Sequence, residues 1–182
     1  RTQRDSEWVF LAEVAVNATV PGPTWRHAAL GKPVTLANPP QTKQALFTYA
    51  AHGPPAFLTD GYQSGVPDWQ TPEWLGFDKD LDATIDLGAV IDLHEVSATF
   101  MQHAYSRVRI PQTMQIHVSD DGKAFNKVAT VAHEPSNAGE MIKTLSAKLD
   151  GAKGRHVRVV APNQGGWLFV DEIVVNPQQD DK

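Results

Sequence analysis

Hydrophobic and polar residues alternate with a period of two along most of this chain, which predicts β-strands. Seven short segments show this alternation or a run of aliphatic residues: 83–87, 96–100, 114–118, 127–131, 143–145, 156–160 and 167–175. Only Pro55–Leu58 and Thr42–Ala51 suit helical turns. The pattern therefore predicts a chain made almost entirely of strands.

The segments between the predicted strands are rich in residues that favour turns. They include Ser119–Gly122, Asp150–Gly151 and Pro162–Gly166. Short strands separated by frequent turns are typical of antiparallel β-sandwiches and barrels. We therefore expect an all-β fold, an antiparallel β-sandwich.

Length, charge and composition narrow the possible functions. The 182 residues suit one domain, or one domain plus a fragment. The formal net charge is -5 and no basic cluster occurs, so the sequence predicts no binding to nucleic acid. No run of about 18 apolar residues is present, so it predicts no membrane-spanning segment. The absence of cysteine excludes disulfides, thiolate metal sites and cysteine nucleophiles.

One segment near the start of the sequence is similar to one near its end. Glu7–Asn17 aligns with Gly166–Asn176 at an offset of 159 residues, with Trp, Phe, Glu, Val and Asn identical. That offset is too long for a solenoid repeat and suits a whole domain. We interpret residues 1–23 as the closing strand of a preceding similar domain plus a linker, and residues 24–178 as the domain itself. Chance similarity between two amphipathic strands is the alternative.

Six motifs in order resemble the discoidin-like, coagulation factor 5/8 type C family. They are Ala29–Thr35, Leu58–Gly61, Trp74–Phe77, Thr84–Gly88, Ile116–Phe125 and Val170–Ile173. The resemblance covers about Trp25 to Pro177 and is greatest to modules attached to bacterial, hexosaminidase-like glycoside hydrolases. It implies a galactose-binding-like jelly roll that binds carbohydrate without catalysing a reaction. It also implies a catalytic glycosidase domain in the same full-length chain and an exported bacterial protein.

Residue patterns of common enzyme sites are missing, in agreement with a non-catalytic module. The sequence contains no Gly-x-Ser-x-Gly, His-Glu-x-x-His or P-loop motif. Its seven histidines are scattered without the spacing of metal ligands. A pair of catalytic carboxylates requires a walled cleft, for which short loops leave little room.

The resemblance implies a structural Ca²⁺ site where the Asp-Gly turn meets the closing strand. Its ligands here would be the carboxylates of Asp60 and Glu172, with the carbonyl of Asp171 as a further candidate. Several hard oxygen ligands of this kind suit Ca²⁺. The family usually has Thr-x-Trp nearby, whereas this chain has the longer Thr71–Trp74. The alternative is that Asp60 caps its own turn and Glu172 is solvated.

Candidate ligand-binding residues lie in three loops that a sandwich would bring to one end. His103, Tyr105 and Arg107 supply an imidazole, an aromatic ring and a guanidinium between two predicted strands. Asn163 and Trp69 lie in the two other loops. Neutral sugars bind by stacking on aromatic rings and by hydrogen bonds to planar polar groups. We expect Tyr105 to stack, and Trp167 and Trp74 to belong to the core.

Two functions remain open from the sequence. The first is a glycan-binding module of galactose or N-acetylhexosamine type that targets an attached glycoside hydrolase. The second is a structural spacer or protein-interaction domain that has lost its sugar site. The spacer is favoured by Arg107, since many relatives have a tryptophan near that position.

Overall fold

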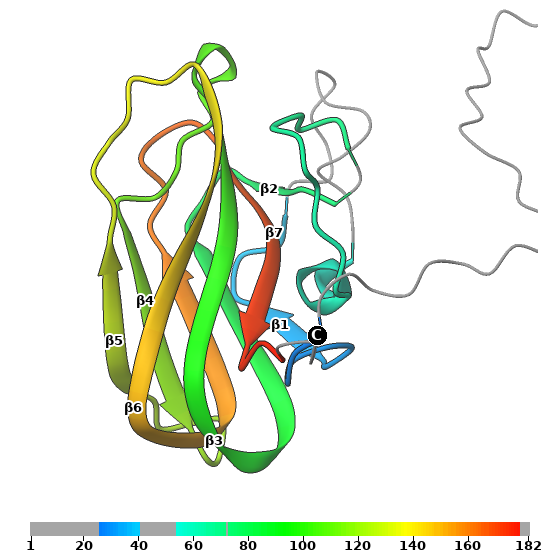
Figure 1. The fold of residues 1–182 in the computed structure, drawn as a ribbon, viewed down its shortest axis with the longest axis vertical. Coiled ribbons are helices and arrows are strands. Elements are labelled where there is room, and N and C mark those ends of the chain that lie inside the picture. Colours follow the sequence, from blue (N-terminus) through cyan, green and yellow to red (C-terminus); the bar gives the residue numbers. More distant parts are fainter. Residues whose placement is uncertain (1–25, 41–53, 72, 179–182) are drawn as a thin grey trace, which may run out of the picture.

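The fold is an antiparallel β-sandwich, seen in a computed structural model that describes residues 26–40, 54–71 and 73–178 (Figure 1). The elements in chain order are β1 (Val34–Leu36), η1 (Pro55–Thr59), β2 (Leu75–Phe77), β3 (Leu81–His103), η2 (Ala104–Ser106), β4 (Thr113–Ser119), β5 (Asn126–Ala132), β6 (Glu140–Ala161) and β7 (Leu168–Val175). All strand pairs are antiparallel. The predicted all-β class is confirmed.

Two long strands, β3 and β6, run through both layers of the sandwich. Each bends near the bottom of Figure 1, and their shared register is broken between Asp86 and Ile91 and between Leu93 and Glu95. One layer has the order β5–β4–β6–β3–β1, and the other has the order β6–β3–β7–β2. The sequence predicted the strand segments, but not that pairs of them belong to the same continuous strand.

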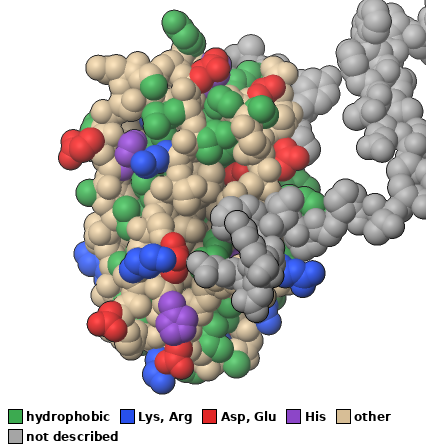
Figure 2. Space-filling view, in the orientation of Figure 1, with side chains coloured by type: hydrophobic (Ala, Val, Ile, Leu, Met, Phe, Trp, Pro, Cys, Tyr) green, Lys and Arg blue, Asp and Glu red, His purple; other side chains and the backbone are tan. Residues whose placement is uncertain are grey.

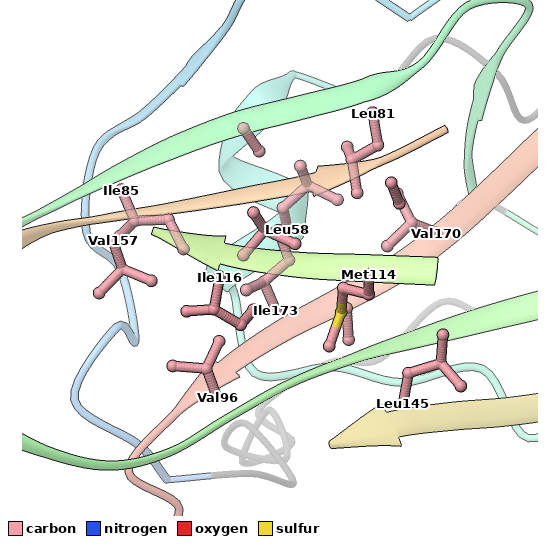
Figure 3. Close-up of a cluster of buried hydrophobic side chains, with 14 of the residues drawn as sticks. Leu58, Leu81, Ile85, Val96, Met114, Ile116, Leu145, Val157, Val170 and Ile173 are labelled. Carbon is pink, nitrogen blue, oxygen red and sulfur yellow. The ribbon is translucent and has the colours of Figure 1, made fainter. Parts of the chain in front are cut away.

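The main hydrophobic core fills the space between the two layers (Figure 3). Ile85, Ile116 and Val157 come from one layer and meet Val96 and Ile173 of the other; each of these side chains is buried. Burial of such side chains contributes about 1.5–3 kcal/mol each relative to the exposed state. The period-two pattern of the sequence is therefore the pattern of inward-facing positions.

A second, smaller cluster covers the other face of β7. Trp74, Met101, Val108 and Phe169 form it, with Trp69 and Trp167 packed at its edge. Because both faces are covered, every residue of β7 is buried. The expectation that Trp74 and Trp167 belong to the core is confirmed: Trp74 has no exposed surface and Trp167 is partly buried.

The helical content among the described residues is limited to the two 3-10 turns, η1 and η2. The turn predicted at Pro55–Leu58 is η1, while the one predicted at Thr42–Ala51 lies outside the described residues, as do residues 1–25. Within the described ranges, neither turn has the length or apolarity needed to cross a membrane.

Candidate functional site

Loops between the strands meet at one end of the sandwich, at the top of Figure 1. We call this the loop end; it comprises residues 61–71, 73–74, 103–112, 133–139 and 162–167. Backbone hydrogen bonds connect its loops: Ala104 N–H donates to Gly139 O over 2.7 Å, and Arg109 N–H donates to Trp167 O over 2.9 Å. Hydrogen bonds therefore connect residues 103–112, 133–139 and 162–167, and Val66, Pro67 and Asp68 adjoin them across a cleft.

A close approach between two of these loops requires a glycine. Gly166 has φ of 109°, and a Cβ placed on it would lie 2.3 Å from the carbonyl oxygen of Arg107. Arg107 itself has φ of 58°, in the left-handed region, and its N–H donates to Ala104 O. Its carbonyl accepts the N–H of Trp167 at 2.9 Å. The backbone on both sides of this contact is thus fixed in conformations that few residues adopt.

Tyr105 is the most exposed large hydrophobic side chain in the described part of the chain, at 91% exposure. It lies on η2, directly after β3, with its ring beside Gly139 of the neighbouring loop. An aromatic ring held out on a short, hydrogen-bonded turn provides a flat apolar surface without a large entropy loss on binding. The stacking role of Tyr105 stays a prediction.

Two clefts open next to this turn. The first, the His103 cleft, has a volume of about 340 Å³ and is lined by Val66, Pro67, Asp68, His103 and Glu140. The second, the Arg109 cleft, has a volume of about 260 Å³ and is lined by Gln102, Arg109, Ile110, Gln112, His133, Pro135, Ser136, Asn137 and Gln164. Gln102 and His103 are consecutive on β3, so their side chains point to opposite faces of the strand and line different clefts.

The predicted ligand residues divide among these surfaces. His103 lies in its cleft 3.3 Å from the carboxylate of Glu140, and its Nδ1 is buried without a partner. Arg107 is exposed at the loop end. Trp69 is half-buried against the smaller hydrophobic cluster. The structure therefore brings His103, Tyr105 and Arg107 together on one turn and places the Trp69 ring against the cluster.

The side chain of Asn163 is hydrogen-bonded to its own loop and to the end of β2. Its Nδ2 donates to the carbonyls of Phe77 and Gly166, both at 3.3 Å, and its Oδ1 accepts the N–H of Gly165 at 2.9 Å. These bonds shape the loop that carries Gln164 into the Arg109 cleft. Asn163 thus positions a neighbour, and its own amide groups are already hydrogen-bonded.

The sequence reasoning missed the Arg109 cleft. Its wall includes His133, Ser136 and Asn137 from the loop between β5 and β6. That loop was visible as the polar interval between the predicted strands 127–131 and 143–145. Its proximity to the turn at Tyr105 follows from the pairing of β3 with β6, which local sequence does not reveal.

A buried group of acids lies under the loop that begins at Asp60. A β-bulge opposite Thr99 carries Asp171 and Glu172, and neither acid has any exposed surface. Glu172 Oε1 accepts the N–H of Gly61 at 3.2 Å and lies 2.9 Å from Nε2 of His27. The alternative that Glu172 is solvated is therefore wrong. Asp60 Oδ1 accepts the N–H of Tyr62 at 2.9 Å, so Asp60 does cap its turn.

Burial controls the ionisation of this group. It raises the pKa of Asp171 to about 8 and that of Glu172 to about 9, in the latter case with repulsion from Asp60 as the next cause. Burial also lowers the pKa of His27 to about 4. Nδ1 of neutral His27 accepts a hydrogen bond from the N–H of Val175 at 3.5 Å. The ring proton is therefore on Nε2, and this N–H donates a hydrogen bond to Oε1 of Glu172.

The acids fit a cation in part. Asp171 Oδ1 and Glu172 Oε2 are buried oxygens without a hydrogen-bond partner, and both are hard donors that suit Ca²⁺. Among the described residues, however, no three acidic or histidine side chains surround a single point where a metal ion would fit. A cation here would need backbone carbonyls or water to complete its coordination.

Comparison with known proteins identifies the family. The F5/8 type C domain model matches residues 41–173. Among curated protein sequences, none matches this chain.

Three solved structures illustrate the similarity of fold. CpGH89CBM32-5 from Clostridium perfringens, solved with GalNAc-beta-1,3-galactose, is 19% identical with a TM-score of 0.55, over 80% of this chain and 95% of that one. A fucose binding module from Streptococcus pneumoniae is 18% identical with a TM-score of 0.54, over 85% and 99%. The C-terminal domain of a chitobiase from Bacteroides fragilis is 14% identical with a TM-score of 0.52, over 82% and 97%. This chain belongs to the F5/8 type C domain family.

Proposed function

We propose that this domain is a non-catalytic carbohydrate-binding module whose glycan lies across Tyr105. The observation that carries the proposal is the 91% exposed tyrosine on a short turn beside two polar clefts. A sugar ring stacks well on an aromatic surface exposed in this way. His103 and Arg107 on the same turn supply hydrogen-bond donors to sugar hydroxyl groups.

The expected ligands are glycans of galactose or N-acetylhexosamine type. Two structures of the same fold bear names that point to sugars: one was solved with GalNAc-beta-1,3-galactose, and another is a fucose binding module. A shallow site of this kind excludes little water, so we expect a Kd of about 0.1–1 mM for a single site. Linkage to an enzyme that works on a repetitive glycan would raise occupancy through effective concentration.

The wider context of the module is part of the proposal. We infer that it targets a glycoside hydrolase in the same full-length chain and that the protein is exported from a bacterium. The similar fold of the C-terminal domain of a chitobiase supports this arrangement. A structural spacer remains the second candidate, and Arg107 at the loop end is the observation that favours it.

A tandem arrangement is supported by the structure of β7. The identities with Glu7–Asn17 include Phe169, Glu172 and Asn176. Phe169 packs in the smaller cluster, Glu172 accepts buried hydrogen bonds, and Asn176 has φ of 49° with its side chain bonded to the β3 bend. Each identity falls where β7 needs that side chain, which supports a preceding module of the same fold. Removal of residues 1–20 is expected to lower the Tm by less than about 4 °C, and a fall above about 8 °C would contradict this division.

We propose a Ca²⁺ site at Asp60 and Glu172, with the carbonyl of Asp171 as a further ligand. A bound cation would stabilise both carboxylates in the ionised form and so offset the cost of their burial. The support is Oε2 of Glu172, which is buried without a hydrogen-bond partner. The side chain of the adjacent Asp171 has a second such oxygen, Oδ1.

A glycan array followed by NMR titration tests the binding proposal. We expect chemical-shift changes at residues 103–107 with galactose or N-acetylhexosamine oligosaccharides at millimolar concentrations. Tyr105→Ala should raise the Kd obtained from these changes about two- to tenfold. Val128→Ala on β5 is the control for an exposed apolar side chain away from the loop end. Absence of any bound glycan on the array, and of shifts at 10 mM sugar, would favour the spacer.

A further inference from the structure

The two clefts of the loop end differ in charge. The His103 cleft contains the carboxylates of Asp68 and Glu140. The Arg109 cleft contains one guanidinium and one imidazole, from Arg109 and His133, and no acidic side chain of the described residues lines it. On the face shown in Figure 2, a histidine and a basic side chain lie together near the upper left, with an acidic side chain beside them at the left edge. The Arg109 cleft therefore suits an anion better than a cation.

Among the residues that the structure describes, Arg109 has no partner for its charge. No hydrogen bond or ion pair joins its side chain to another described residue, whereas Arg155 and Arg158 on β6 each form two bonds to one aspartate. A guanidinium presents paired N–H donors whose spacing matches the two oxygens of a carboxylate. An unpaired arginine at the wall of a cleft is thus available for a carboxylate from outside the protein.

His133 adds a second group to the same wall. Its Nε2 is buried and has no hydrogen-bond partner, although the residue lines the cleft. Burying a polar atom without a partner costs free energy, which a ligand atom would recover. The His133 N–H donates to Gln112 O at 2.8 Å, so the backbone that carries this imidazole is held in place.

The wall around these groups is preorganised. Gln102 is 3% exposed, and its Nε2 donates to the carbonyls of Ser136 and Ala138 at 3.2 and 2.5 Å. These bonds tie the β5–β6 loop to the end of β3. The backbone of Arg109 is fixed in turn by its bond to Trp167 O. Binding therefore requires little ordering of the protein, which favours affinity.

The size and remaining chemistry of the cleft suit one sugar residue. Its volume of about 260 Å³ is just below the range of about 300–1,000 Å³ typical of pockets for drug-sized ligands. Besides Arg109 and His133, it offers the amides of Gln112, Asn137 and Gln164, which donate and accept hydrogen bonds as sugar hydroxyls require. A small cleft with several amides and one cationic corner matches a single acidic monosaccharide.

We propose that the Arg109 cleft is a subsite for a carboxylate-bearing sugar residue, a uronic acid, within a glycan that also contacts Tyr105. This inference rests on the proposed carbohydrate-binding function and names the ligand class. Arg109 holds the carboxylate, His133 donates to it or to a neighbouring hydroxyl, and the amides bind the other hydroxyls. A sulfated sugar shares the negative charge but not the planar two-oxygen shape.

The test compares matched ligands on the folded module by isothermal titration calorimetry and NMR. The probes are digalacturonate, its neutral counterpart digalactose, and a 6-sulfated galactose. Arg109→Gln removes the charge but keeps a polar side chain. Lys123→Gln removes one charge from the β4–β5 hairpin tip at the opposite end of the sandwich and is the control for general electrostatics.

We expect digalacturonate to bind at least tenfold more tightly than digalactose and to shift residues 109–112 and 133–137. Arg109→Gln should weaken the binding of digalacturonate about tenfold or more, as expected for the loss of hydrogen bonds to a charged group. It should change the affinity for digalactose by less than twofold. Lys123→Gln should leave both ligands unchanged. Added salt should weaken only the charged ligand.

Different results overturn different statements. Neutral glycans bound on the array without a preference for digalacturonate would overturn the subsite and leave the module's function intact. An equal loss of affinity for both ligands in Arg109→Gln would also overturn the subsite alone. Tighter binding of the sulfated sugar than of digalacturonate would overturn it as well. If the module binds no glycan on the array, both the subsite and the proposed function are wrong.

Discussion

Basic side chains of this domain are ion-paired along the strands, whereas two arginines at the loop end have no ion pair with a described residue. Along the strands, basic residues of β6 are paired with acids of β3; the pairs are Lys148–Glu95, Lys153–Asp92, Arg155–Asp86 and Arg158–Asp82. At the loop end, Arg107 and Arg109 form no such bond to another described residue. Paired charges fix the register of neighbouring strands, whereas unpaired ones remain available to a ligand.

The buried acids beneath residues 60–64 form an intermediate case. Asp171 and Glu172 each have one oxygen bonded to a backbone N–H and one oxygen without a partner. Full pairing along the strands is explained by sheet stability alone. The groups near the loop end that lack a partner require another explanation: a bound proton, a cation or a ligand would complete their interactions.

The largest expected effect comes from the glycine that joins the loops. Gly166→Ala places a Cβ against the Arg107 carbonyl at a φ that alanine rarely adopts. We expect the free energy of unfolding to fall by about 3 kcal/mol or more, in urea denaturation, and glycan binding to be lost. Gly151→Ala is the matched control, since Gly151 also has a positive φ but has open space around it. It should cost about 1 kcal/mol. Equal losses in the two variants would show that the loop contact is unimportant.

The second effect concerns the buried acids. Their pKa values are raised, so the folded state holds protons that the unfolded state has released above about pH 4. Stability without metal should therefore decrease as pH rises from about 5 to 9, because this contribution is lost as pH passes the folded pKa values. Ca²⁺ at 100 times its Kd should add about 2.7 kcal/mol and flatten that slope.

Thermal melts in EDTA and in millimolar Ca²⁺, at each pH, measure both quantities. Glu172→Gln cannot ionise but keeps an oxygen for the N–H of Gly61, so it should reduce the slope in EDTA. A Tm that is the same with and without Ca²⁺ would exclude an occupied site. A stability that is constant over this pH range in EDTA would contradict the raised pKa values.

The third effect separates paired from unpaired arginines. Arg158→Ala removes both bonds to Asp82 and the packing on Phe125, 5.8 Å from the ring centre. We expect a loss of about 1 kcal/mol. Arg109→Ala should change stability by less than about 0.5 kcal/mol, since it breaks no bond to a described residue. If both variants lost the same stability, the contrast between strands and loop end would fail.

The smallest effect is expected at Tyr105. Because the side chain is 91% exposed, Tyr105→Ala should leave the Tm within about 1–2 °C of that of the parent protein. The substitution should weaken glycan binding by about 0.5–1.5 kcal/mol, which corresponds to a Kd about two- to tenfold higher. Tyr105→Phe keeps the ring and should bind almost normally. A large fall in Tm for Tyr105→Ala would assign the ring to folding and not to ligand binding.

The sequence alone determined the fold class and the position of the strand segments. Alternation at residues 83–87, 114–118 and 156–160 reports which side chains point into the core, and that information is local. The same reasoning located the turn with His103, Tyr105 and Arg107, since three chemically active residues between two strands must lie in or near a loop.

Only the tertiary structure decided which of these side chains remain available. Asn163 was a reasonable binding residue by type, but Phe77 and Gly166 already occupy its amide. Arg109 and His133 are 24 positions apart and meet in one cleft because β3, β5 and β6 end at the same edge of the sandwich. Burial and partnership depend on contacts between distant segments, which local pattern and residue type do not encode.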